Sequence, residues 1–306
     1  MRRRDLLLTA LVLTLLPKPV AAQEPDRTWR IGVLTPTVVA ASTIHQFTLP
    51  ELARLGFVEG QNLTLRTFSA DGDYERFPAL ADDLVEWKPD VIIANASTTA
   101  IRAARAATAT IPIVMSFAGE DPVEAGWAES YARPSGNVTG IVMLSPELDG
   151  KRLQIFHEAF PSARRLAVLY LPRAANSPNA RAMETAAAKI GIEIVPFLAA
   201  TPDEYEAAFE AMRSAKVDGL AISSNPIFIG DIALLAELAM SVGLPTICEW
   251  RVTAEKGCLI SYGPSNAELR RRTADFVARI LRGTPAGELP LEKPTVFEML
   301  VNLNTA

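Results

Sequence analysis

Short runs of Val, Ile and Leu alternate with longer amphipathic stretches along the first half of the chain. Each short run has the length and the β-branched content of a buried strand, and each amphipathic stretch has the spacing of a helix. Near-continuous apolar strands separated by helices are typical of βαβ units on a parallel sheet. The predicted strands are Trp29–Leu34, Asn62–Phe68, Pro89–Ala94 and Ile111–Phe117, and the predicted helices include Phe47–Leu55, Glu75–Trp87 and Thr98–Ala107.

The same order of landmarks then occurs a second time. Four pairs of similar segments are separated by 135, 135, 128 and 133 residues. Chance similarity is the alternative, since buried parallel strands look alike, but the nearly constant offset favours duplication of one unit. We therefore predict an α/β protein with two similar doubly wound parallel-sheet lobes and a cleft between them. The pairs are Trp29–Pro36 with Arg164–Pro172, Leu55–Phe57 with Ile190–Ile192, Lys88–Asp90 with Lys216–Asp218, and Ile111–Val114 with Leu244–Ile247.

The N-terminus has the layout of a secretory signal peptide over residues 1–22. Three arginines (Arg2–Arg4) precede an apolar run (Leu6–Leu16), and a small-residue stretch (Val20–Ala22) follows as the cleavage site. A membrane anchor is the alternative, but about eleven apolar residues are too few for a hydrocarbon core that needs roughly twenty. The sequence therefore predicts export, by either the general or the twin-arginine route.

Composition excludes several classes of function. The 30 basic and 35 acidic residues give a net charge of −5, so the chain lacks the basic surplus of a nucleic-acid-binding protein. Only two histidines (His45 and His157) and two cysteines are present, too few for a Cys/His zinc cluster. The glycine-rich nucleotide-binding motifs and the nucleophile elbow are also absent from the sequence. We expect no nucleic-acid partner, no metal and no cofactor.

The two cysteines are expected to remain buried thiols. Cys248 ends one predicted strand and Cys258 begins the next, which puts a strand of about four or five residues, roughly 15 Å, between them. A disulfide needs Cα atoms within about 7 Å. Both cysteines belong to the second lobe, which also argues against a two-cysteine racemase with one thiol from each lobe.

Residues that follow predicted strands are the candidates for ligand binding, because loops at the carboxyl ends of parallel strands form the ligand crevice. Thr35 and Asn95 follow strands of the first lobe. Ser97 and Thr98 begin a helix, where they either cap its end or receive a ligand carboxylate. Asn225 lies in the equivalent turn of the second lobe.

Four aromatic residues also lie at or just beyond strand ends: Phe117, Tyr170, Trp250 and Tyr262. Aromatic side chains in such positions either pack loops onto the core or, where they converge, form an apolar slot for a planar solute. We list all four as candidate ligand contacts.

Charged residues near the same strand ends leave two interpretations open. Asp121 and Glu249 are candidates for binding a ligand ammonium, with capping and ion pairing as the alternative. Arg173 is a candidate for clamping a carboxylate. The cluster Arg270–Arg272, in contrast, is expected to form a solvated helix face.

Several longer stretches resemble the periplasmic solute-binding components of ABC importers, in the branch that includes tryptophan- and tyrosine-type binding proteins. They are Leu55–Asn62, Ala118–Val123, Ala132–Gly140, Ser261–Pro264 and Pro294–Glu298. The third is the most specific, and the resemblance covers essentially the whole chain beyond residue 30. It implies a type I periplasmic-binding fold with three crossover segments and no catalytic activity.

On this resemblance, residues 23–141 and about 264–283 form the N-terminal lobe, and residues 142–263 and about 284–306 form the C-terminal lobe. The expected function is capture of an amino-acid-like or aromatic carboxylate solute by lobe closure, and its delivery to an ABC permease in the inner membrane. We expect a periplasmic monomer. The alternative is a two-lobe α/β enzyme, such as a racemase or hydrolase, acting in the same cleft.

Overall fold

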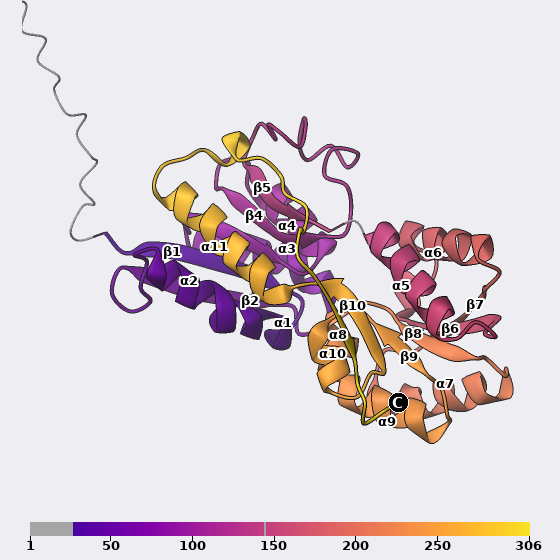
Figure 1. The fold of residues 1–306 in the computed structure, drawn as a ribbon. Helices are drawn as coiled ribbons and strands as arrows, with labels where there is room; N and C mark the ends of the chain where they lie inside the picture. Colours follow the sequence, from indigo (N-terminus) through magenta and orange to yellow (C-terminus); the bar gives the residue numbers. More distant parts are fainter. Residues whose placement is uncertain (1–26, 144) are drawn as a thin grey trace, which may run out of the picture.

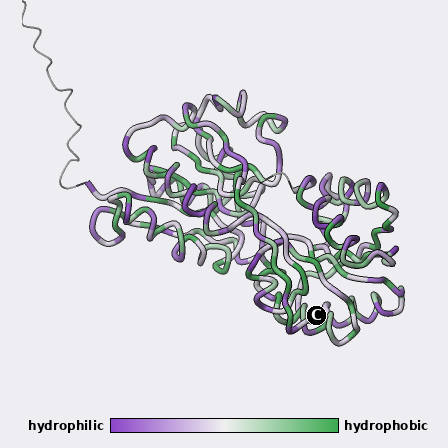
Figure 2. Tube along the Cα trace, viewed as in Figure 1, coloured by the Kyte–Doolittle hydropathy of each residue, from purple (hydrophilic) through white to green (hydrophobic). Residues whose placement is uncertain are grey.

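The computed structural model describes residues 27–143 and 145–306, which form two α/β lobes lying side by side (Figure 1). The expected signal peptide, residues 1–22, lies outside the described residues. Hydrophobic residues follow the strands inside both lobes, and polar residues occupy the outer faces of the helices (Figure 2). No described helix combines the length and the hydrophobicity that a membrane crossing requires.

The N-terminal lobe contains a parallel sheet of five strands in the order β2-β1-β3-β4-β5. Helices cover both faces, so the strands are apolar almost throughout, and β3 is buried at all its positions. Helices α1, α2 and α11 cover one face, and α3 and α4 cover the other. The bounds are β1 Trp29–Thr35, α1 Val38–Thr43, η1 Ile44–Thr48, α2 Leu49–Arg54, β2 Leu63–Ser69, η2 Tyr74–Arg76, α3 Phe77–Glu86, β3 Val91–Asn95, α4 Thr98–Ala107, β4 Ile113–Ala118, β5 Val138–Val142, α11 Asn266–Leu281 and η4 Ala286–Glu288.

The C-terminal lobe contains six strands in the order β11-β10-β9-β8-β6-β7, and only the edge strand β11 is antiparallel. Helices α5 and α6 cover one face of this sheet, and α7 and α9 cover the other. The bounds are α5 Ser145–Ala159, β6 Arg165–Tyr170, η3 Pro172–Ala174, α6 Pro178–Lys189, β7 Glu193–Leu198, α7 Pro202–Ser214, β8 Gly219–Ile222, α8 Pro226–Gly230, α9 Ile232–Ser241, β9 Thr246–Cys248, α10 Arg251–Glu255, β10 Ile260–Pro264 and β11 Phe297–Val301.

The duplication predicted from the sequence is present in the strand order, because β7-β6-β8-β9-β10 repeats β2-β1-β3-β4-β5. Equivalent landmarks also make equivalent contacts. The Asp90 carboxylate accepts the backbone N–H of Arg30 at 2.8 Å, and the Asp218 carboxylate accepts that of Arg165 at 2.9 Å. The predicted fold class, two parallel-sheet lobes, is therefore confirmed.

The chain passes between the lobes three times, after β5, after β10 and before β11, as the resemblance implied. Ala286 and Leu289 still pack in the core of the N-terminal lobe. The backbone N–H of Glu292 donates to the carbonyl of Gly140 at 3.0 Å. The last crossover therefore follows Glu292, later in the chain than the expected boundary near residue 283.

The most specific stretch of the resemblance, Ala132–Gly140, has a structural role. The Asn137 side chain donates to the carbonyls of Thr108 and Ile111, at 3.1 and 2.9 Å, and so holds the loop before β4. Gly140 has a φ of +128°, and a Cβ there would lie 2.2 Å from the carbonyl oxygen of Met115. Only glycine fits this contact between β4 and β5.

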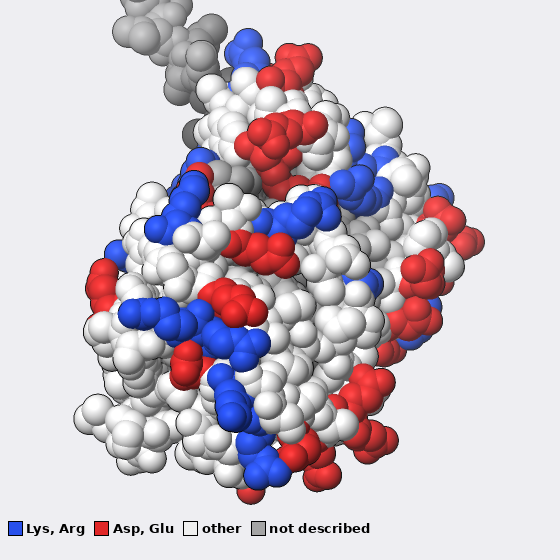
Figure 3. All heavy atoms as spheres, turned by 90° about the vertical axis from the view of Figure 1, so that its right-hand side faces the viewer, with Lys and Arg blue, Asp and Glu red and all other residues white. Residues whose placement is uncertain are grey.

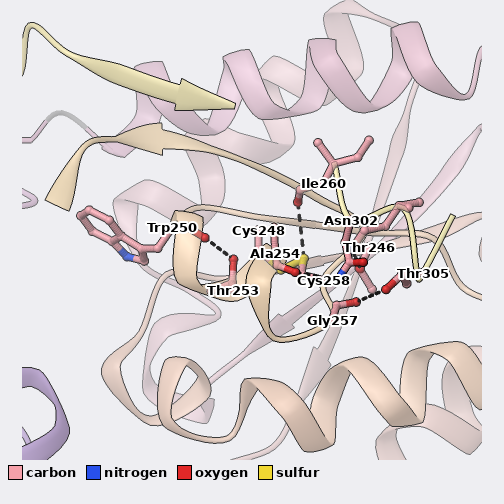
Figure 4. The surroundings of a disulfide bond; sticks show 11 residues. Thr246, Cys248, Trp250, Thr253, Ala254, Gly257, Cys258, Ile260, Asn302 and Thr305 are labelled. Carbon is pink, nitrogen blue, oxygen red and sulfur yellow. Dashed lines mark hydrogen bonds between the residues drawn. A yellow bond between two sulfur atoms is a disulfide. The ribbon is translucent and has the colours of Figure 1, made fainter. Parts of the chain in front are cut away.

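The two cysteines are not thiols, and this prediction was wrong. Cys248 and Cys258 form a disulfide, with their Cα atoms 6.5 Å apart (Figure 4). The prediction assumed a strand of four or five residues between them. Strand β9, however, contains only Thr246–Cys248, so its carboxyl end lies close to the turn that carries Cys258.

Candidate ligand-binding site

Polar side chains gather at the carboxyl edge of the N-terminal sheet. Thr35 and Asn95 end β1 and β3, Ser116 lies beside Asn95 in β4, and all three are completely buried. The Asn95 amide donates to the Thr35 hydroxyl and to the carbonyl of Ala40, both at 3.1 Å. Two of these residues, Thr35 and Asn95, were predicted from the sequence as ligand contacts.

Arg270 reaches this cluster from α11. Its Nη1 donates to the Oδ1 of Asn95 and, at 2.8 Å, to the hydroxyl of Ser116. The side chain is only 2% exposed, and no carboxylate in the described part of the chain lies within ion-pair distance of it. Its Nε is buried without a hydrogen-bond partner. Burial lowers the pKa of the guanidinium to about 9.

The expectation of a solvated Arg270–Arg272 cluster is therefore wrong for one of its members. The side chains of Arg271 and Arg272 are 54% and 40% exposed, as a solvated face requires. Arg270 lies instead on the face of α11 that packs against the sheet, beside buried Leu269 and Thr273.

The facing edge of the C-terminal lobe carries a surplus of negative charge. Arg152 of α5 donates to the Asp149 carboxylate at 2.5 Å and lies 3.9 Å from the Glu249 carboxylate. Arg152 also donates to the carbonyl of Tyr262 at 3.2 Å. One guanidinium thus faces two carboxylates, and the Oε2 of Glu249 is buried without a partner.

Glu249 is 3% exposed, and burial raises the pKa of its carboxyl group, with Arg152 acting in the opposite direction. A carboxyl group whose pKa is higher in the folded than in the unfolded state destabilises the fold once it ionises. The protonated group contributes its full stabilisation at pH values below the pKa of the unfolded state. This contribution is lost as the pH rises through the pKa of the folded state.

The contribution of Glu249 to the free energy of unfolding of the ligand-free protein should therefore fall as the pH rises above about 4.5. Chemical denaturation at several pH values, with wild type and Glu249→Gln compared at each, measures this contribution. We expect the difference between the two proteins to grow in favour of the glutamine variant as the pH rises. A difference that stays constant from pH 4 to pH 8 would contradict the assignment.

Two aromatic side chains connect the lobes between these charged groups. The rings of Phe117, from β4, and Trp250, which precedes α10, lie 5.6 Å apart at an interplanar angle of 36°. The Arg270 guanidinium lies over the Phe117 ring, 4.3 Å from its centre. The Trp250 indole donates to the Ser224 hydroxyl at 3.2 Å. Phe117 and Trp250, two of the four aromatic candidates, thus contact each other across the lobes.

The backbone is strained at the same edge. Ala96 and Phe117 have φ values of +50° and +73°, in a region that residues with a Cβ rarely adopt. Such strain persists where the surrounding structure holds it and is concentrated at functional sites. Ala96 directly follows Asn95, and Phe117 directly follows Ser116, the two residues that accept hydrogen bonds from Arg270.

A pocket of about 130 Å³ opens in the C-terminal lobe, at the edge that carries Arg152 and Asn225. An apolar cavity of roughly 150 Å³ holds a molecule the size of benzene, so this pocket suits a single ring. Its walls are mainly apolar and include Tyr170, whose hydroxyl contacts the Met183 sulfur at 3.4 Å. Its polar groups come from Asp149, Arg152, Ser177, Asn179, Ser223, Ser224 and Asn225.

The remaining predicted residues have local structural partners. Ser97 caps α4 by accepting the backbone N–H of Ala100 at 3.3 Å, and Thr98 is the first residue of that helix. Asn225 lines the pocket and also caps α8 through the N–H of Ile227, at 2.9 Å.

Asp121 and Tyr262 are engaged away from the Arg270 cluster. The Asp121 carboxylate accepts the N–H of Val123 and the hydroxyl of Tyr131, at 2.8 and 3.0 Å. The Tyr262 ring stacks on Phe297 of the edge strand β11. The structure brings Phe117 and Trp250 together but leaves Tyr262 outside that contact.

A further contact joins the lobes outside the charged edges. The Arg173 guanidinium, from the loop after β6, lies 3.1 Å from the centre of the Tyr74 ring in the N-terminal lobe. Ile229 of α8 and Val252 of α10 also pack against the core cluster of the N-terminal lobe. Arg173 therefore contacts an aromatic ring across the lobes, where a carboxylate clamp was the expectation.

The comparisons with known proteins agree with this architecture. The sequence model of a family described as ABC transporter substrate binding protein matches residues 42–306. A tyrosine-binding protein of Clostridioides difficile is 27% identical over 252 residues, which cover 82% of this chain and 71% of that protein.

Solved structures show the same fold. A conserved domain protein from Vibrio cholerae has a TM-score of 0.82 and 26% identity, with 92% of this chain and 94% of that chain covered. An ABC domain from Streptococcus pneumoniae, solved in complex with L-Trp, has a TM-score of 0.76 and 21% identity, with 91% and 93% covered. Together with the family match over most of the chain, the two lobes and their facing charged edges lead to one assignment: the chain belongs to the family of ABC transporter substrate-binding proteins.

Proposed function

We propose that the protein captures an amino acid or an aromatic carboxylate between its lobes and presents it to the permease of an ABC importer. The observation that carries this proposal is the pair of opposite buried charges on the two facing edges: Arg270, which has no carboxylate partner among the described residues, and Glu249, which shares the Arg152 guanidinium with Asp149 and has one oxygen without a partner. A buried charge without a partner costs several kcal/mol, on the order of the desolvation penalty of an ion. A ligand that carries both charges removes that penalty on both sides.

The arrangement also indicates how the ligand lies. A ligand carboxylate binds Arg270 and Asn95 in the N-terminal lobe, and a ligand ammonium binds Glu249 in the C-terminal lobe. An aromatic or apolar side chain then contacts Phe117 and Trp250 and extends toward the pocket beside Tyr170. The named ligands of two relatives, tyrosine and L-Trp, have this combination of groups.

Ligand capture is expected to work by closure. A solute that contacts both lobes binds the closed arrangement more tightly than the open one and shifts the population toward it. We propose that residues 1–22 direct export, that the mature chain acts in the periplasm as a monomer, and that the closed form docks on the permease. Positive and negative residues are interspersed on the face that carries α6 and β7, so this face lacks the continuous basic patch of a nucleic-acid interface (Figure 3).

The disulfide favours binding over the enzymatic alternative. A two-cysteine racemase needs two free thiols that face the substrate from opposite lobes. In this protein Cys248 and Cys258 are bonded to each other within one lobe. We propose that the protein binds its solute without converting it.

The contact between Tyr74 and Arg173 provides a test of closure away from the ligand. Tyr74→Leu removes the ring, and since a cation–π contact contributes about 0.5–2 kcal/mol, we expect solute affinity to fall by roughly 2- to 30-fold. Tyr74→Phe keeps the ring and is the matched control. Isothermal titration gives the affinity and small-angle scattering gives the lobe separation. Equal affinity and equal separation in all three proteins would exclude a role for this contact in closure.

The experiment that tests the proposed function is identification of the native solute. Purified protein is denatured, and the released small molecules are identified by mass spectrometry. The same molecules, together with L-tyrosine, L-tryptophan and benzoate, are then titrated into solute-free protein. Release and binding of a carboxylate-containing solute supports the proposal. Turnover of that solute into a product, or binding restricted to uncharged sugars, would refute it.

A further inference from the structure

The segment that carries Glu249 and Trp250 begins and ends at the disulfide. Cys248 precedes Glu249 directly, and Cys258 closes the segment after α10. Both sulfur-bearing residues are almost fully buried, at 2% and 0% exposure. The disulfide therefore fixes the two ends of the segment that forms the C-terminal wall of the site (Figure 4).

The segment has little regular structure to hold itself in place. Helix α10 contains only five residues, and no side chain caps its N-terminus. Helices of this length are not stable by themselves, because one turn costs more entropy than its hydrogen bonds return. The internal bonds are few and include the Thr253 N–H and hydroxyl, both donated to the Trp250 carbonyl, at 2.8 and 2.5 Å.

The C-terminal tail supplies a second attachment. The Asn302 amide donates to the carbonyl of Ala254 at 2.7 Å, and the Thr305 hydroxyl donates to that of Gly257 at 3.0 Å. These bonds satisfy carbonyls at the end of α10. Figure 4 shows both tail residues beside the disulfide, on the side of the segment away from the Trp250 ring.

We propose that the Cys248–Cys258 disulfide and Asn302 are positioning elements of the binding site, which hold Glu249 and Trp250 where a solute meets them. The proposal rests on the proposed function. Preorganisation of a binding wall raises affinity because the ordering entropy has been lost before the ligand arrives. Without the disulfide, the wall has to be ordered at each binding event.

The test compares the double variant Cys248→Ala/Cys258→Ala with wild type, using L-tyrosine and 3-(4-hydroxyphenyl)propanoate, which is tyrosine without its amino group. We expect affinity for L-tyrosine to fall by about tenfold, and the preference for L-tyrosine over the deaminated analogue to fall with it, because Glu249 no longer meets the ammonium. Amide hydrogen exchange should accelerate in peptides covering Glu249–Gly257 and stay unchanged in the N-terminal lobe. Asn302→Ala should shift both measurements in the same direction by less.

A stability control separates positioning from general weakening of the lobe. Ile192→Ala opens a cavity on the opposite face of the sheet, where Ile192 is 3% exposed. It should lower the melting temperature while leaving the tyrosine preference and the exchange of Glu249–Gly257 unchanged. Unchanged exchange of that segment in the double variant overturns this inference whatever solute binds. Failure of wild type to bind any carboxylate overturns the proposed function instead, and an accelerated segment in the double variant then still supports positioning.

Discussion

Replacing Arg270 with methionine is expected to weaken binding of a carboxylate solute such as L-tyrosine by roughly 30-fold or more, with a smaller effect on the stability of the ligand-free protein. The loss follows from removal of a buried charge partner, which costs about 2–5 kcal/mol of binding energy. The free energy of unfolding should change by no more than about 1–3 kcal/mol in either direction, because removal of a buried charge that has no carboxylate partner among the described residues opposes the loss of the hydrogen bonds to Asn95 and Ser116. Titration calorimetry and urea denaturation measure the two effects.

Arg271→Met is the matched control for this variant, because Arg271 is the next residue on α11 and its side chain is 54% exposed. It should change neither affinity nor stability noticeably. If Arg270→Met instead binds like wild type and unfolds far more easily, Arg270 is a structural residue of the N-terminal lobe, and the proposed carboxylate contact is incorrect.

Glu249→Gln is expected to change selectivity rather than to abolish binding. A hydrogen bond to a charged group contributes about 1.5–3 kcal/mol, so the preference for L-tyrosine over its deaminated analogue should fall by roughly tenfold to a hundredfold. Affinity for the analogue should stay the same or rise, because the variant no longer buries, beside it, a carboxylate with one unpartnered oxygen. Competition titrations with both ligands measure the ratio.

Glu255→Gln serves as the control for this second variant. Glu255 ends α10, and its side chain is 49% exposed and paired with Arg251. Removal of its charge should leave the ratio unchanged. An unchanged ratio in Glu249→Gln would mean that the ammonium, if the solute has one, binds another group.

The fold was predictable because its signal is repeated. Each buried strand is apolar along its length, and the second lobe repeats the order of the first, so errors at single elements did not change the architecture. The paired landmarks also have the same backbone conformation: Lys88 and Lys216, at equivalent turns, both adopt a left-handed φ, of 53° and 52°. The position of the last crossover was less predictable, since the chain from Ala286 to Glu292 has no strand pattern and packs by contacts distant in sequence.

The charged part of the site was predictable only in part. Glu249 was a candidate from the sequence because it follows a strand, whereas Arg270 was not, because a run of three arginines on a helix usually faces water. A signal was present: Arg270 lies three and seven residues before Thr273 and Val277, on the buried stripe of α11. The contacts of Asp121 with Tyr131 and of Tyr262 with Phe297 could not be predicted from the sequence, because they depend on which loops and strands meet in space.

The central claim is that one solute meets Arg270 from one lobe and Glu249 from the other. The most direct test is a crystal structure of the protein with the solute that it releases on denaturation. We predict that the solute carboxylate lies within hydrogen-bond distance of Arg270 and Asn95, with Phe117 and Trp250 against its apolar part. A solute held entirely in the pocket between α5 and α6, without contact to the N-terminal lobe, would contradict the claim.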